Sequence, residues 1–224
     1  MTDSSSAPRP RGRPARITRD EIVDAAATRL REGGDTALTM KAIATDLGVS
    51  TMALYRHVRN RDELIVAVLD REVATLDMPA PVGDAQTQVC DIFEWLYLEL
   101  AARPWVVEVI SRGDFTAPTI RDVLERILEK FVSLGLDVER AADAYLTVWR
   151  YTIGTLVIGK RTDETRSVVR RELVQDAALV QASAEQHPLL HEAASHWIHA
   201  RQSMDYRAGL EALVRGLINS SHTY

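Results

Sequence analysis

Hydrophobic residues recur at helical spacing along most of the chain, and no alternating strand pattern stands out. The first helical stretch follows a Thr-x-x-Glu capping box formed by Thr18 and Glu21, and we expect Gly33-Gly34 to stop it. The same spacing predicts further helices over about 40–47, 51–57, 60–76, 85–103, 105–111, 119–134, 137–160, 164–185, 187–199 and 205–219. The sequence therefore predicts an all-α fold.

A break at residues 78–83, Met-Pro-Ala-Pro-Val-Gly, interrupts the helical pattern and is typical of a linker. We expect a three-helix domain over 17–64, a connecting helix to about residue 77, and a helical domain over 84–224. Residues 1–16 are rich in Ser, Pro and Arg and are predicted to form a disordered basic arm. The arm is either a solvated tail or a segment that follows DNA phosphates or enters a minor groove.

Charge is unevenly distributed along the chain. The 224 residues are 46% hydrophobic, enough for one large or two modest domains, and their formal net charge is -5. The first twenty residues nevertheless hold five arginines against two aspartates, and residues 41–61 hold four basic residues against Asp46 alone. This asymmetry favours an N-terminal end that binds DNA, joined to an acidic body.

The chain has a single cysteine, Cys90, which excludes an intrachain disulfide and is predicted to be a buried thiol. No apolar run approaches the length of about 20 residues that spans a membrane, and the Arg-rich N-terminus lacks the apolar segment of a secretory signal. We therefore expect a cytoplasmic protein with no membrane partner.

Histidines occur in pairs near the C-terminus, His187 with His191 and His196 with His199, at spacings that can ligate a metal. They lie in a polar stretch without cysteine or a distinctive acidic partner, so a solvated or capping role is favoured and we expect no metal and no cofactor. The chain also lacks a Gly-rich phosphate loop, a Gly-x-Ser-x-Gly elbow and a distinctive carboxylate pair. We therefore do not expect an enzyme.

Residues 39–64 have the outline of a helix-turn-helix. Gly48 suits a tight turn that needs a positive φ, and Ser50 is placed to cap the next helix. Leu54 and Val58 are spaced to pack inwards. The DNA major groove admits one helix, and the side chains of this short helix that remain free to face it are Thr51, Met52, Tyr55 and His57.

Two basic residues flank this turn. Lys41 begins the helix before it, where backbone amides favour a phosphate oxygen, and Arg61 begins the helix after it, where it can clamp the DNA backbone. The alternative interpretation is an ordinary three-helix packing unit with solvated charges.

The motifs of this domain resemble the TetR family of transcriptional repressors: Ile22-x-x-Ala25-Ala26, Thr39-Met40-Lys41-x-Ile43-Ala44, Leu47-Gly48-Val49-Ser50 and Ala53-Leu54-Tyr55-Arg56-His57-Val58-x-Asn60-Arg61-x-x-Leu64. The resemblance implies a bacterial homodimer, nucleoid-associated when bound, whose two recognition helices bind a palindromic operator in double-stranded DNA. It implies phosphate contacts by Thr39 and Lys41, base contacts by Thr51, Met52 and Ala53 beside Ser50, and backbone contacts by Tyr55, His57 and Arg61. Because Met52 and Ala53 have no hydrogen-bonding side chain, we expect thymine methyl contacts and DNA shape to supply part of the specificity.

The C-terminal domain resembles, more loosely, the effector domain of the tetracycline-repressor branch, at residues 145–154, 187–188 and 206–217. The resemblance implies that the long helix from Asp137 and the last helix form a four-helix bundle with those of a second copy. Intrachain packing is the alternative. The residues of the last helix expected at the dimer interface are Ala208, Gly209, Ala212, Leu213, Gly216 and Leu217.

Aromatic residues are concentrated in this domain, and together they favour a pocket for a small, mostly apolar effector of unknown identity. The expected pocket residues are Phe93, Trp95, Trp105, Arg112, Phe115, Phe131, Tyr145, Trp149 and Thr152. For any single aromatic residue, core packing is the alternative. The tetracycline repressor uses histidine to meet a drug-bound magnesium ion, and this chain has no histidine between His57 and His187, which argues against that ligand.

The sequence therefore predicts a homodimeric repressor that a ligand releases from its operator, by biasing the angle between the two DNA-binding heads. The alternative is a DNA-binding regulator without a small-molecule effector, controlled by a protein partner.

Overall fold

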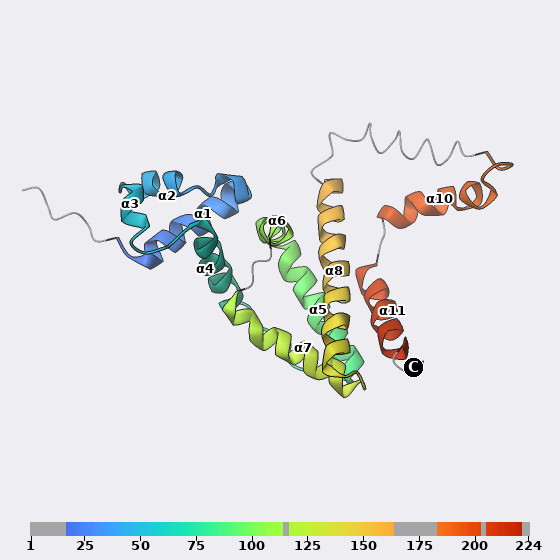
Figure 1. The fold of residues 1–224 in the computed structure, drawn as a ribbon. Helices are drawn as coiled ribbons and strands as arrows, with labels where there is room; N and C mark the ends of the chain where they lie inside the picture. The colour runs from blue at the N-terminus through green and yellow to red at the C-terminus, as the bar shows by residue number, and fades with distance from the viewer. Residues whose placement is uncertain (1–16, 114–116, 164–182, 203–204, 221–224) are drawn as a thin grey trace, which may run out of the picture. The chain divides into compact units, whose positions relative to one another are not determined.

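The computed structural model describes residues 17–113, 117–163, 183–202 and 205–220, and every regular element in these ranges is a helix (Figure 1). The predicted all-α fold is confirmed. The chain divides into two compact units, Met1–Val68 and Leu69–Tyr224. The predicted arm and most of the helix expected over 164–185 lie outside the described residues. Within the described ranges, no helix is long and apolar enough to cross a membrane.

The first unit contains α1 (Arg19–Ala37), α2 (Met40–Asp46), α3 (Thr51–Leu54) and the start of α4 (Arg61–Ala74). The second unit contains the end of α4, then α5 (Ala85–Ala101), α6 (Pro104–Arg112), the 3-10 turn η1 (Pro118–Ile120), α7 (Arg121–Ser133), α8 (Val138–Asp163), α10 (Pro188–Gln202) and α11 (Tyr206–Asn219).

The beginning of α1 has the predicted capping box. The Thr18 hydroxyl accepts a hydrogen bond from the Glu21 amide at 3.2 Å, and the Glu21 carboxylate accepts one from the Thr18 amide at 2.8 Å. Two of the unpaired amides at the helix start are thereby satisfied. The inward face of α1 then buries Ile22, Ala26 and Leu30 in the core of the first unit.

The end of α1 differs from the sequence prediction. Gly34 does interrupt the helix, with φ 65° and ψ -165°, a conformation open essentially only to glycine. Helical turns nevertheless resume beyond this kink as far as Ala37, and Leu38 follows in an extended conformation with its side chain 1% exposed. The buried Leu38 anchors the segment that leads into α2.

Helix α3 is shorter than the predicted 51–57. Regular α-helix ends at Leu54, and the His57 and Val58 amides both donate to the Leu54 carbonyl, at 2.9 and 3.1 Å. The chain thus tightens into a turn at the point where Val58 enters the core. Gly48, between α2 and α3, has the expected positive φ of 63°.

The core of the second unit lies between α5, α7, α8 and α11, which pack against one another (Figure 1). Each helix contributes fully buried side chains, among them Phe93 from α5, Phe131 from α7, Val148 from α8 and Leu210 from α11. Asp137 caps the start of α8, because its carboxylate accepts a 2.8 Å hydrogen bond from the Arg140 amide.

Candidate nucleic-acid interface and aromatic core

The expected phosphate-contacting residues lie at the start of α2. Thr39 is the N-cap of this helix, and its hydroxyl accepts a hydrogen bond from the Ala42 amide at 3.1 Å. Lys41, in the first turn, is exposed. The cap fixes where α2 begins, so Lys41 projects from a defined backbone position.

Helix α3, the predicted recognition helix, has one buried side and one exposed side. Leu54 and Val58 are 0% and 2% exposed, which confirms that they pack inwards. On the other side Met52 is 71% exposed and Tyr55 48% exposed, while Thr51, Ala53 and His57 are half-buried. The Ser50 hydroxyl accepts a hydrogen bond from the Ala53 amide at 3.3 Å, so Ser50 caps α3 as predicted. An apolar thioether and a phenol ring therefore stand exposed on a short, capped helix.

Ion pairs hold the helices of the first unit together around α3. Arg29 of α1 donates two hydrogen bonds of 2.6 Å to the Asp46 carboxylate at the end of α2. These hydrogen bonds lower the pKa of Asp46 below its ordinary value. The bidentate geometry fixes the angle between α1 and α2.

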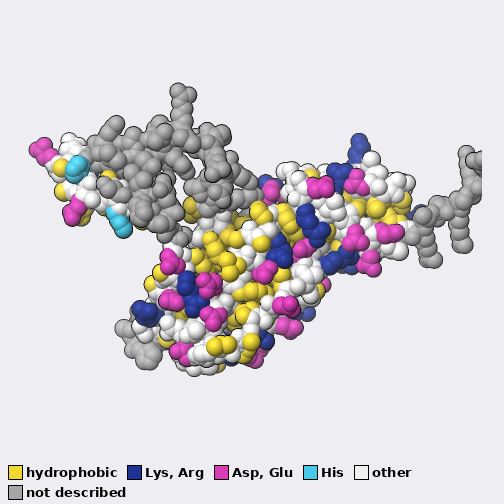
Figure 2. All heavy atoms as spheres, turned by 180° about the vertical axis from the view of Figure 1, so that it is seen from behind, with side chains coloured by type: hydrophobic (Ala, Val, Ile, Leu, Met, Phe, Trp, Pro, Cys, Tyr) yellow, Lys and Arg dark blue, Asp and Glu magenta, His cyan; other side chains and the backbone are white. Residues whose placement is uncertain are grey.

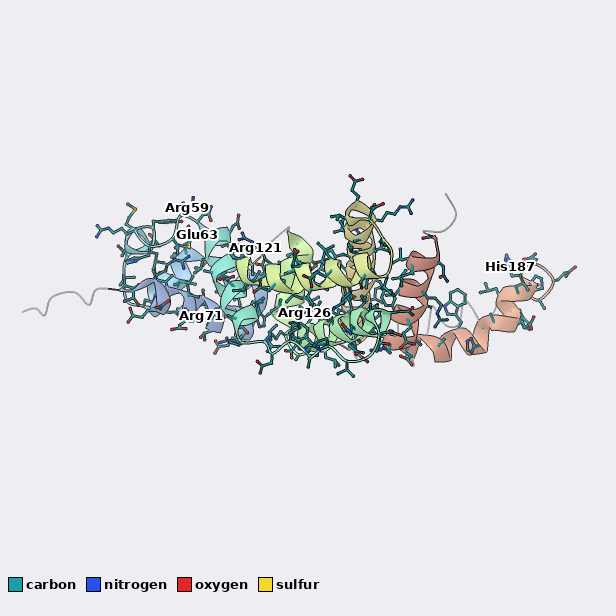
Figure 3. The ribbon with its side chains drawn as sticks, turned by 90° about the horizontal axis from the view of Figure 1, so that it is seen from below. Arg59, Glu63, Arg71, Arg121, Arg126 and His187 are labelled. Carbon is teal, nitrogen blue, oxygen red and sulfur yellow. The ribbon has the colours of Figure 1, made fainter. Side chains whose placement is uncertain are left out.

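A second set of polar contacts closes the turn between α3 and α4. The Glu63 carboxylate accepts a 2.7 Å hydrogen bond from the Arg59 amide and a 3.4 Å one from Arg19 of α1 (Figure 3). The Arg59 amide is the largest cause of the lowered pKa of Glu63. Asn60 caps α4: its side-chain oxygen accepts a 2.8 Å hydrogen bond from the Glu63 amide.

Arg61 is engaged within the chain. Its Nε donates to the Leu38 carbonyl at 2.9 Å, and its Nη2 donates to the Asp35 carbonyl at 2.7 Å and to the Asp35 carboxylate. The Arg61 side chain is 34% exposed and that of Asp35 is 15% exposed. These bonds connect the first residue of α4 to the end of α1 and its C-cap Leu38, whereas the sequence predicted a contact of Arg61 with the DNA backbone.

The aromatic residues expected around an effector pocket belong largely to the core of the second unit. Phe93 and Phe131 are fully buried, and Trp95, Tyr145 and Trp149 are half-buried against them. The other expected residues divide between burial and the surface: Trp105 is 8% exposed, Thr152 is fully buried, Arg112 is exposed and pairs with Glu108 at 2.9 Å, and Phe115 lies outside the described residues.

A small depression lies elsewhere, beside the linker, and none of the expected pocket residues lines it. Its walls are Pro79, Ala80, Pro81, Val82, Gln88, Asp91, Ile92 and Arg126, the last of which is labelled in Figure 3.

Tyr206, which the sequence analysis did not select, joins three helices of the second unit. Its ring stacks on Tyr97 of α5 at a centroid distance of 4.0 Å and on Tyr151 of α8 at 5.4 Å. Its hydroxyl oxygen lies 2.7 Å from that of Thr152. Burial raises the pKa of Tyr206. The stack therefore fixes the start of α11 against α5 and α8.

The neighbouring Arg207 fastens α11 to α5 by charge. Its guanidinium donates to Asp91 and Glu94 of α5 at 2.8 Å each and to Glu211 at 2.7 Å. Burial opposes its charge, but the three carboxylates outweigh this and raise the pKa of Arg207. Cys90 is buried as predicted, and burial raises the pKa of its thiol to about 11, so it is almost wholly protonated at neutral pH.

The expected dimer residues of α11 divide between its exposed side and the core of the second unit: Leu213 and Leu217 pack against that core, and a Cβ on Gly209 would meet Tyr151. Ala208, Ala212 and Gly216 are exposed, and the other three, Gly209, Leu213 and Leu217, are half-buried. Figure 2 shows hydrophobic side chains on the surface of the second unit. Exposed apolar residues on its helices include Leu98 of α5 and Leu146 of α8.

Two family models match the chain. Residues 22–68 match the model described as bacterial regulatory proteins, tetR family, and residues 79–220 match the tetracyclin repressor-like C-terminal domain. The chain belongs to the TetR family. It is therefore a DNA-binding transcriptional regulator, in a family of regulators and not of enzymes.

Relatives of this TetR-family regulator include transcriptional repressors. DrrR1 of Streptomyces coeruleorubidus is 29% identical over 148 residues, which are 64% of this chain and only 54% of that protein. The class D tetracycline repressor of Escherichia coli is 25% identical over 206 residues, covering 90% of this chain and 89% of the repressor. ActR of Streptomyces coelicolor, solved in complex with actinorhodin, matches in fold with a TM-score of 0.77 at 24% identity, covering 92% of this chain and 99% of ActR.

Proposed function

We propose that this TetR-family regulator is a homodimeric repressor that binds a palindromic operator and leaves it when a small, mostly apolar molecule binds its second unit. The observation that carries the proposal is the two-sided α3, with Leu54 and Val58 in the core and Met52 and Tyr55 exposed. Apolar and aromatic side chains exposed on a capped, rigidly held helix need a partner surface, and a major groove accepts one such helix.

In the proposed complex Thr39 and Lys41 bind phosphate at the start of α2. Thr51, Met52 and Ala53, next to the cap residue Ser50, face base edges. Tyr55 and His57 contact the sugar-phosphate backbone at the end of α3. The exposed Met52 thioether cannot donate a hydrogen bond, so in the proposed complex it would contact thymine methyl groups and respond to the shape of the groove.

The proposed dimer uses α8 and α11. Exposed small residues on α11, Ala208, Ala212 and Gly216, would allow close approach of a second helix. Leu213 and Leu217 pack against the core of their own chain and are half-buried, so only the part of each that remains exposed would add apolar area. A symmetric pair of α3 helices would then meet two half-sites of a palindromic operator.

The proposed effector contacts the half-buried aromatic residues Trp95, Tyr145 and Trp149 above the fully buried Phe93 and Phe131. ActR, a protein with a similar fold, has been solved in complex with actinorhodin, which supports the proposal of a small-molecule effector. Because these rings are packed, the ligand would have to displace some of them, and it would thereby shift α5 or α8.

The experiment starts from duplexes enriched from a random-sequence library by the wild-type protein. Lys41→Ala and Tyr55→Ala should each weaken binding of the enriched duplex while the dimer persists, and Lys130→Ala in α7 should not. Unchanged binding by both variants of the first unit would refute the proposed contacts. Release of the bound duplex by apolar aromatic compounds, together with a change in tryptophan fluorescence, tests the effector.

A second candidate function is regulation by a protein partner without an effector molecule. The packing of Phe93 and Phe131 in the core favours it, because rings that complete a core need no ligand. No release by any compound of a broad apolar library, with operator binding intact, would support this function.

A further inference from the structure

The contacts of Arg61 connect the start of α4 to the end of α1. It is the first residue of α4, and its guanidinium donates to the Asp35 and Leu38 carbonyls at 2.7 and 2.9 Å. Leu38 directly precedes Thr39, the N-cap of α2. Arg61 therefore holds the backbone within one residue of the proposed phosphate contacts.

The geometry also explains why an arginine suits this position. The Asp35 and Leu38 carbonyls come from the end of α1, where the helix dipole favours a cation, and the Asp35 carbonyl also accepts a 3.3 Å hydrogen bond from the Leu38 amide. A planar guanidinium donates in two directions at once, from Nε to Leu38 and from Nη2 to the carbonyl and carboxylate of Asp35. A lysine ammonium at this position carries the same charge but lacks that fork.

We infer that Arg61 is a positioning residue: it fixes the start of α2, and with it Thr39 and Lys41, instead of binding DNA itself. This inference rests on the proposed contacts of Thr39 and Lys41 with phosphate, and it replaces the phosphate contact that the sequence predicted for Arg61.

For Asp35→Asn, a positioning role of Arg61 predicts a change in DNA affinity opposite to the one expected from charge alone. Asp35→Asn removes a negative charge, and this loss of charge alone should tighten DNA binding. The substitution also removes a hydrogen-bond partner of Arg61, so it should weaken DNA binding if Arg61 positions α2. Arg61→Lys preserves the charge and should weaken binding by about tenfold, as expected for the loss of one charge-assisted hydrogen bond. Asp62→Asn, an exposed neighbour on α4, is the matched charge control and should not weaken binding.

The deciding experiment is a double-mutant cycle between Arg61→Lys and Lys41→Ala, measured on the duplex enriched by the wild-type protein, with thermal unfolding of each full-length variant as a control. If Arg61 positions α2, Lys41→Ala costs much less affinity in the Arg61→Lys background than alone. Additive losses, or an Arg61→Lys variant that binds like the wild type, would overturn the inference.

Two other outcomes of the same experiment can be told apart: a variant that does not fold, and a Lys41→Ala variant that binds DNA like the wild type. Should Arg61→Lys fail to fold, Asp35→Asn gives the answer, because it keeps Arg61 and its carbonyl bonds: weaker binding supports the inference and tighter binding overturns it. If Lys41→Ala alone has no effect on binding, the proposed contacts of α2 fail, and the inference fails with them.

Discussion

Gly209 is a residue at which a single methyl group should disturb the core of the second unit. A Cβ built on this glycine of α11 would overlap the Tyr151 hydroxyl and lie 3.1 Å from Cζ of the same ring. The Tyr151 hydroxyl itself donates to the Tyr206 carbonyl at 3.3 Å. Gly209→Ala should therefore push Tyr151 out of its stack and lower the free energy of unfolding by about 1–3 kcal/mol, as overpacking does, in urea denaturation.

A matched glycine gives the control for this prediction. Gly154 lies in α8 with nothing within 4 Å of a built Cβ, so Gly154→Ala should stabilise the protein by up to about 1 kcal/mol through helix propensity. In a Tyr151→Phe background, which lacks the hydroxyl, Gly209→Ala should cost less. Equal effects of Gly209→Ala and Gly154→Ala would show that Tyr151 does not pack over α11.

The burial of single residues was predictable from the sequence where helical periodicity determines which side of a helix they occupy. Leu54, Val58 and Cys90 are buried as their spacing indicates. The partners of Arg61 were not predictable, because every residue has a backbone carbonyl and only the tertiary structure decides which one lies near the guanidinium. The stack around Tyr206 was not predictable either, because the tertiary structure decides which rings lie beside this tyrosine.

At the scale of the helix, capping residues set where the elements begin. Asp84 caps α5, and its pKa is lowered chiefly by the hydrogen bond from the Thr87 amide, at 2.8 Å. A carboxyl whose pKa is lower in the folded than in the unfolded state stabilises the fold above its unfolded pKa of about 3.9, and the contribution disappears as the pH falls through the folded pKa.

Asp84→Asn should separate capping from titration. Asparagine caps helices about as well as aspartate, so stability near pH 7 should change little. Below about pH 4 the wild type should lose more stability than the variant, because only the wild type has a carboxylate to protonate there. Thermal unfolding from pH 7 to pH 3 measures the difference, and a constant gap between the two proteins would contradict this assignment.

The sequence predicted the described helices well, and the two differences concern how they end. Glycine marks the interruption at Gly34, but the turns that follow it depend on the burial of Leu38. Likewise α3 stops at Leu54 because Val58 must turn into the core, a tertiary demand that overrides the helical pattern of residues 55–57.

At the scale of the whole molecule, the proposed dimer makes Gly216 informative. This exposed residue of α11 has nothing within 4 Å of a built Cβ in its own chain. Gly216→Leu should therefore leave the fold of the chain intact yet weaken the dimer, because a second helix could no longer approach closely. Sedimentation equilibrium measures the dissociation constant.

Ala101→Leu is the control, since it adds similar apolar bulk at an exposed position of α5. A dimer weakened equally by both changes, or by neither, would contradict an interface on α11.

The positions of the aromatic residues in the second unit could be predicted only in part. A buried core and an apolar pocket both need aromatic walls, so composition alone could not tell that Phe93 and Phe131 complete the core while Trp95 and Trp149 remain half-buried. The helix-turn-helix was more predictable, because its turn, caps and inward residues lie within one short segment.

The most direct test of the account is the salt dependence of binding to the enriched duplex, for the wild type and Lys41→Ala. If α2 and α3 lie on DNA as proposed, the wild type prefers this duplex to a scrambled one, and Lys41→Ala reduces the slope of log K against log salt by about 1. Identical slopes and affinities for the two proteins, or no preference for the enriched duplex, would contradict the account.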